Sequence, residues 1–195
     1  MLITQSFELD QPVDQVWTFF DNIPLVAACI PGADLTKEVS ETEYHGDVTI
    51  SAGPVKLEFT GVVKVESRDD ARKVIVLDAA GADKKGRGTA NALLTVTLAA
   101  LGGNTRVNMS MDLAIAGAAA QYGRGLVQDV TAVLIDQTAG SMKARMTAIA
   151  EGRDPMEVGG PKAASGLAIG LTAFLRAARR VFARFFLPYQ PAPSR

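Results

Sequence analysis

A change in the spacing of apolar residues near residue 119 constrains the fold of this sequence more than any other feature. Between residues 35 and 115, apolar residues alternate with polar ones, as they do in strands that bury one face. From residue 119 to 150 they recur every three or four positions, as on one side of a long helix. This order predicts an α+β fold in which a curved antiparallel sheet of about six to seven strands buries the stripe of the helix.

The segment before this region predicts one more strand and two short helices. Residues 2–9 are rich in strand formers, and apolar residues between 13 and 20 have helical spacing. Pro24 and Pro31 bracket a second short helical segment that contains Cys29.

The composition excludes several classes of protein and of site. A hydrophobic content of 48% with 21% charged residues is typical of a globular protein. One cysteine cannot form an internal disulfide, and one histidine cannot anchor a zinc site alone. The first residues lack the features of a signal peptide, so a cytoplasmic location is expected.

The lone cysteine and the lone histidine are weak candidates for chemistry. The neighbours of Cys29 in the sequence are apolar, and none of them could lower its pKa, so we expect a buried side chain that lines a core or a cavity. His45 has the opposite parity to the apolar residues of its predicted strand, which indicates a solvent-facing position. No catalytic residue and no metal ligand is therefore predicted.

Charge is distributed unevenly along the chain. All 21 acidic residues lie at or before Glu157, whereas the remaining sequence carries Lys162, five arginines and no acid. The net charge is thus negative on the body and positive on the tail. Such asymmetry suggests that the tail has an anionic partner of its own.

The tail contains an amphipathic segment, residues 166–187, with apolar and basic residues on opposite arcs of a helical wheel. Its uncharged run, Ala163 to Leu175, is too short for a simple membrane span, which needs about 20 residues. A helix packed on protein remains open. An interfacial membrane helix is favoured, because each buried large apolar side chain contributes about 1.5–3 kcal/mol and each arginine about 1 kcal/mol at an anionic leaflet. The predicted membrane-binding residues are Leu167, Leu171, Phe174, Leu175, Arg176, Arg179, Arg180, Phe182, Arg184 and Phe185.

Several short motifs resemble one known family. They are VWTFFDN at 16–22, ACIPG at 28–32, GPV at 53–55, FTG at 59–61, KGRGTA at 85–90 and GNTRV at 103–107. Together they resemble the carbon monoxide dehydrogenase G-subunit family of the START-like (SRPBCC) superfamily. The resemblance implies a helix-grip fold, in which sheet and long helix enclose an apolar cavity.

The same resemblance implies a function. It indicates a non-catalytic accessory protein that carries a respiratory quinone, menaquinone or ubiquinone, and recruits a molybdenum hydroxylase such as carbon monoxide dehydrogenase to the inner face of the cell membrane. A polyketide cyclase or aromatase-like enzyme, a general lipid-binding protein and a pure tether remain alternatives.

These expectations divide the chain and name a set of ligand-contacting residues. The predicted units are a ligand-binding domain at 1–151, a flexible linker at 152–165, the membrane-binding helix at 166–187 and a disordered end at 188–195. The predicted ligand-binding residues are Phe20, Leu25, Cys29, Ile30, Leu57, Phe59, Leu94, Met109, Met111, Tyr122, Leu126 and Val130.

Overall fold

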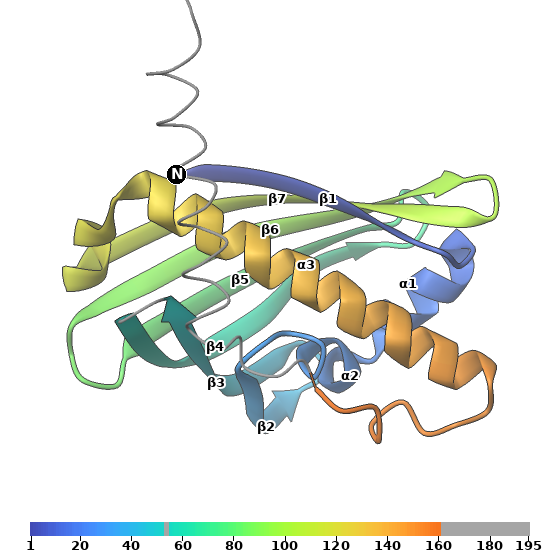
Figure 1. The fold of residues 1–195 in the computed structure, drawn as a ribbon, viewed down its shortest axis with the longest axis horizontal. Helices are drawn as coiled ribbons and strands as arrows, with labels where there is room; N and C mark the ends of the chain where they lie inside the picture. Colours follow the sequence, from blue (N-terminus) through green and yellow to red (C-terminus); the bar gives the residue numbers. More distant parts are fainter. Residues whose placement is uncertain (53–54, 161–195) are drawn as a thin grey trace, which may run out of the picture.

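The computed structural model describes residues 1–52 and 55–160 (Figure 1). The chain begins with strand β1 (Leu2–Leu9), followed by helices α1 (Val13–Asp21) and α2 (Ile23–Ala27). Strand β1 and helix α1 confirm the predictions for this segment. The prediction that Cys29 lies inside the second helix is wrong, because α2 ends two residues earlier and Cys29 lies in the turn that follows. The next residue, Ile30, precedes Pro31, and a residue before proline is disfavoured in the helical conformation.

A single antiparallel sheet forms the body of the protein, with strand order β1-β7-β6-β5-β4-β3-β2. The predicted meander is confirmed, and β1 completes it by pairing with the last strand. The sheet therefore has two edges, β1 and β2. Its other strands are β2 (Ala33–Ser40), β3 (Glu43–Ala52), β4 (Val55–Asp69), β5 (Val74–Asp83), β6 (Gly88–Leu101) and β7 (Asn104–Gly117).

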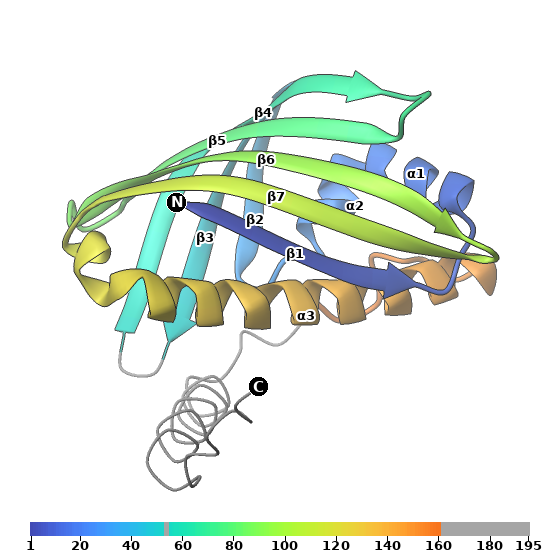
Figure 2. The same ribbon diagram turned by 90° about the horizontal axis from the view of Figure 1, so that it is seen from above.

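A long helix, α3 (Gly123–Ala150), lies along the concave side of the curved sheet (Figure 2). The short 3-10 helix η1 (Ala118–Tyr122) precedes it, so the predicted helix begins with a tighter turn than expected. Most of the apolar stripe predicted over residues 119–150 faces the sheet, but Ile149 is 47% exposed, so the prediction that the stripe is buried up to its last residues is wrong. It lies in the last turn of α3, beyond the buried Met146 and Ala148.

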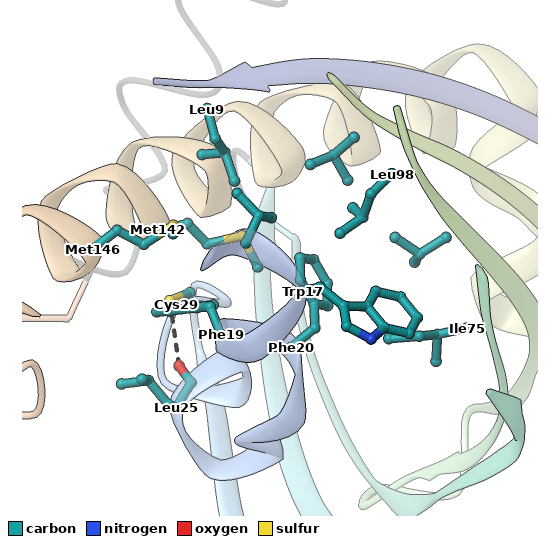
Figure 3. Close-up of a cluster of buried hydrophobic side chains, with 13 residues drawn as sticks. Leu9, Trp17, Phe19, Phe20, Leu25, Cys29, Ile75, Leu98, Met142 and Met146 are labelled. Atoms are coloured by element: carbon teal, nitrogen blue, oxygen red, sulfur yellow. Dashed lines mark hydrogen bonds between the residues drawn. The ribbon is translucent and has the colours of Figure 1, made fainter. Parts of the chain in front are cut away.

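A hydrophobic core fills the space between α1, the second half of α3 and the sheet, which we call the closed end (Figure 3). Helix α1 contributes Trp17 and Phe20, the second half of α3 contributes Met142 and Met146, and Cys29 packs beside them. The other buried members come from α1, α2 and four strands: Leu9, Val16, Phe19, Leu25, Ile75, Val96, Leu98 and Val107.

The indole of Trp17 also ties α1 to the β4–β5 turn. Its Nε1 donates a hydrogen bond to the Asp70 carboxylate at 2.8 Å, and the Arg68 guanidinium stacks 3.9 Å from the ring centroid. Arg68 in turn pairs with Asp21 at the end of α1. These contacts fix the closed end, and the open half of the grip contains the candidate site.

Candidate ligand-binding cavity

An apolar cavity of about 430 Å³ lies between the sheet, α2 and the first half of α3. This volume is within the usual range for small-molecule sites. The helices line it with Ile23, Val26, Ala27 and Ile30 from α2 and the turn after it, and with Leu126, Val127, Val130, Thr131 and Leu134 from α3. The sheet supplies the floor.

A row of small residues in register across four strands makes room for the cavity. Gly46 of β3 is paired with Gly61 of β4, which is paired with Gly81 of β5, which is paired with Ala90 of β6. All four line the cavity. Side chains at these positions would fill the space under α3, so the row leaves it open.

Two of these glycines are also required by the backbone. A Cβ on Gly46 would lie 2.8 Å from the Asp34 carbonyl oxygen. A Cβ on Gly61 would lie 2.3 Å from the Ala80 carbonyl oxygen and 2.8 Å from the Gly81 Cα, closer than real Cβ atoms come. A Cβ on Gly81 would meet only ordinary contacts, the nearest at 3.5 Å. Gly61 therefore allows close strand packing, whereas Gly81 mainly preserves volume.

The hydroxyl groups in the lining, those of Tyr44 and Thr131, already have partners within the protein. The Tyr44 side chain is buried, and its hydroxyl donates to the Glu41 carbonyl oxygen at 2.9 Å. Burial is the largest cause of the raised pKa of Tyr44. The Thr131 hydroxyl donates to the Val127 carbonyl oxygen within α3. The cavity interior therefore favours a hydrocarbon ligand that makes few hydrogen bonds.

The other ionisable residues of the lining lie towards solvent. The His45 imidazole contacts the Glu43 carboxylate at 3.2 Å, and its side chain is 41% exposed, consistent with the predicted solvent-facing position. The Asp47 carboxylate accepts a hydrogen bond from Lys84 at 2.6 Å, the largest cause of its lowered pKa. Asp34 is exposed. Among the described lining residues there is thus no buried acid–base pair.

Five of the predicted ligand-binding residues line the cavity, and they come from the turn after α2, from β4 and from α3. Phe20, Leu25 and Cys29 lie in the core of the closed end instead. Leu94 and Met109 pack against that core, and Met111 lies on β7 but does not line the cavity. The side chain of Tyr122 lies outside what the structure describes. The five that line the cavity are Ile30, Leu57, Phe59, Leu126 and Val130.

Sequence reasoning missed the α2 residues Ile23, Val26 and Ala27 and the glycine row. In a helix of five residues the spacing does not indicate which face meets a core and which a cavity. The glycines became a signal only once the pairing of β3, β4 and β5 was known.

Cys29 is a structural residue of the core. Its side chain is fully buried, its Sγ donates to the Leu25 carbonyl oxygen at 3.3 Å, and burial is the largest cause of its raised pKa. The neutral thiol is therefore favoured, which suits packing and not nucleophilic attack.

A buried arginine next to Cys29 ties the end of the described chain to α2. Arg145 is 2% exposed, and its guanidinium donates to the carbonyl oxygens of Pro155 and, at 3.1 Å, Ala28. It forms no ion pair with a carboxylate among the described residues. Residues 151–160 form no helix or strand and are held on the body at Pro155.

Neither a metal site nor a membrane span is found in residues 1–52 and 55–160. No group of three or more His, Cys, Asp or Glu side chains in this part of the chain could hold a metal ion. No helix in it is both long and apolar enough to cross a membrane. Gly53 and Pro54 of the GPV motif, the segments 166–187 and 188–195 and every predicted membrane-binding residue lie outside the described residues.

A family model described as the G subunit of carbon monoxide dehydrogenase (CoxG) matches residues 6–147, which include nearly all of the sheet and most of α3. The chain belongs to the CoxG family. No curated protein matches it in sequence.

Solved structures similar to this CoxG family member have the same fold at low sequence identity. A conserved protein from Geobacillus kaustophilus has a TM-score of 0.68 at 20% identity, with 75% of this chain and 95% of that chain covered. A START superfamily protein from Mycobacterium smegmatis has a TM-score of 0.51 at 11% identity, covering 76% and 98%. The Zhui aromatase/cyclase from Streptomyces sp. R1128 has a TM-score of 0.50 at 12% identity, covering 77% and 93%. The predicted START-like helix-grip fold is confirmed.

Proposed function

We propose that this CoxG family member binds a respiratory quinone in its cavity and recruits a molybdenum hydroxylase of the carbon monoxide dehydrogenase type to the inner face of the cell membrane. The observation that carries the proposal is the apolar cavity, whose hydroxyl groups already have partners inside the protein. Such a wall favours a long hydrocarbon chain, and an isoprenoid quinone supplies one. Menaquinone and ubiquinone both fit this description.

The recruitment step rests on the charge distribution and on the family. The body is negatively charged, which favours a basic patch on the partner enzyme, and the cationic tail favours anionic lipids. Membership of a family described by a subunit of carbon monoxide dehydrogenase supports an enzyme of that type as the partner. The protein would then bring its ligand and the enzyme to the same membrane surface.

We propose further that the protein has no catalytic activity of its own. General acid–base catalysis needs a positioned proton donor or acceptor in the site. The ionisable side chains of the described lining, apart from Tyr44, lie towards solvent, and the Tyr44 hydroxyl is engaged with a backbone carbonyl. The similarity to the aromatase/cyclase concerns the fold alone.

The sharpest test of ligand binding uses two neighbouring positions on β5. Gly81→Val adds three carbons on the cavity side, and its Cβ would lie no closer than 3.5 Å to any other atom, whereas Ala82→Val enlarges an exposed side chain on the opposite face. At about 0.8 kcal/mol per buried carbon, losing three ligand carbons weakens binding by about 2.4 kcal/mol, or about 50-fold. Quinone affinity is measured by quenching of the fluorescence of Trp17, the only tryptophan.

The proposal predicts a large loss for Gly81→Val and an unchanged affinity for Ala82→Val, with both variants folded by circular dichroism. Equal affinities in the two variants would remove the cavity as the quinone site.

A further inference from the structure

The cavity is not sealed by the described residues. Ile30 lines it and is nevertheless 38% exposed, and Ile23, Val26, Leu126 and Val127 are only partly buried. We call these five residues the apolar rim. The backbone of α3 lies closest to β1, which is one edge strand of the sheet. The other edge strand is β2, and on that side α3 leaves the apolar rim uncovered. An apolar surface of this kind in water favours a covering partner.

The described chain ends beside this rim. A Cβ on Gly160 would lie 3.9 Å from the carbonyl oxygen of Ala28, in the turn between Val26 and Ile30. Arg145 fixes this arrangement by binding Ala28 and Pro155 at the same time. The tail therefore starts from a fixed point next to the apolar rim.

The dimensions of the tail suit the rim. Residues 161–165 can span at most about 17 Å, which keeps the next segment close to α2. As a helix, residues 166–187 would be about 33 Å long, with an apolar stripe that includes Leu171, Phe174 and Phe182.

The charges of the β2–β3 hairpin and of the tail segment also favour binding of the tail at this position. The β2–β3 hairpin, residues 33–52, carries five acids and one lysine, and β2 is the edge strand next to α2. Its carboxylates Asp34, Glu38 and Glu41 form no ion pair with another described residue. The segment 166–187 carries four arginines and no acid.

We propose that residues 166–187 of this chain dock on the apolar rim when no membrane is present. The apolar stripe that covers the rim is the stripe that would enter a lipid surface. The segment therefore cannot bind the rim and a membrane at the same time. Given the membrane binding proposed above, the rim becomes uncovered only where the tail has transferred to lipid.

The test measures the distance between two spin labels in the full-length chain by pulsed electron paramagnetic resonance. The labels are attached at Lys37→Cys, exposed on β2, and at Ala183→Cys, on the polar arc of the tail segment. Cys29 is fully buried and does not take up label. In buffer the proposal predicts a single narrow peak below about 33 Å, the length of the segment as a helix. Anionic phosphatidylglycerol vesicles should abolish this peak.

Matched charge variants test the contact surface. Glu38→Gln with Glu41→Gln should broaden the peak, whereas Glu8→Gln with Asp112→Asn, acids at the opposite edge of the sheet, should leave it unchanged. A broad distribution in buffer for the unaltered chain would overturn the proposal. Vesicle co-sedimentation of the same labelled protein separates the two claims: co-sedimentation with a broad distribution refutes docking alone, and a narrow peak without co-sedimentation supports docking and refutes membrane binding.

Discussion

The glycine row predicts opposite effects for the same substitution at two paired positions. In Gly61→Ala, the new Cβ would lie 2.3 Å from the Ala80 carbonyl oxygen, so the backbone of β4 or β5 must shift. In Gly81→Ala, the nearest atom is 3.5 Å away, so the methyl group fits. Both glycines lie on the cavity side of adjacent strands, which makes each a control for the other.

The expected magnitudes follow from these contacts. Overpacking at Gly61 should lower the free energy of unfolding by about 1–3 kcal/mol. Gly81→Ala should raise it by about 0.4–1 kcal/mol, because alanine restricts the unfolded chain more than glycine does. The two variants should therefore differ by about 1.4–4 kcal/mol, which corresponds to about 3–16 °C in Tm for a chain of this size.

Thermal unfolding followed by circular dichroism measures this difference, with urea unfolding as a second measure. Gly103→Ala, in a turn with open space around the glycine, controls for the substitution itself. Equal stabilities of Gly61→Ala and Gly81→Ala would refute the register of β4 and β5 and, with it, the described floor of the cavity.

Three further predictions concern buried polar and ionisable groups. The Cys29 thiol should resist a water-soluble alkylating reagent at pH 8 in the folded protein and react fully in denaturant, because burial raises its pKa; rapid labelling of the folded state, detected by mass spectrometry, would contradict its core position. Hydrogen bonds from Arg87 lower the pKa of Asp83 to about 2, so its stabilising contribution is complete above about pH 4 and is lost as pH falls through 2. Asp83→Asn should therefore flatten the decline of Tm between pH 4 and 2, and an unchanged decline would refute the role of this pair. Arg145→Met should accelerate tryptic cleavage after Arg153 at least about tenfold, because hydrogen bonds that hold residues 151–160 are lost; cleavage at the wild-type rate would show that Arg145 does not anchor them.

The order of elements and the inward faces of β3, β4, β6 and β7 were predictable from the sequence, because both depend on local spacing. The alternation that includes Leu57 and Phe59 on β4 and Ala90 and Ala92 on β6 correctly identified the cavity side. The register between strands depends on contacts far apart in the chain. The alignment of Gly46, Gly61 and Gly81 could therefore not be read from one sequence.

The boundary between the core and the cavity could not be predicted from the sequence either. The stripe of α3 is continuous in the sequence, yet Leu126 and Val130 line the cavity while Met142 and Met146 fill the core. Apolar side chains line the cavity and also fill the core, so periodicity cannot tell the two apart. For this reason Phe20 and Cys29 were predicted to contact the ligand, whereas the structure places them in the core. Tertiary packing decides this division.

Organic extraction of the full-length protein purified from native membranes, followed by mass spectrometry, shows whether the cavity holds a quinone. We expect a quinone in about one-to-one ratio with the protein and its loss in Gly81→Val but not in Ala82→Val. A protein that carries no quinone from membranes rich in it, or carries the same amount in both variants, would contradict the claim that this cavity is a quinone site.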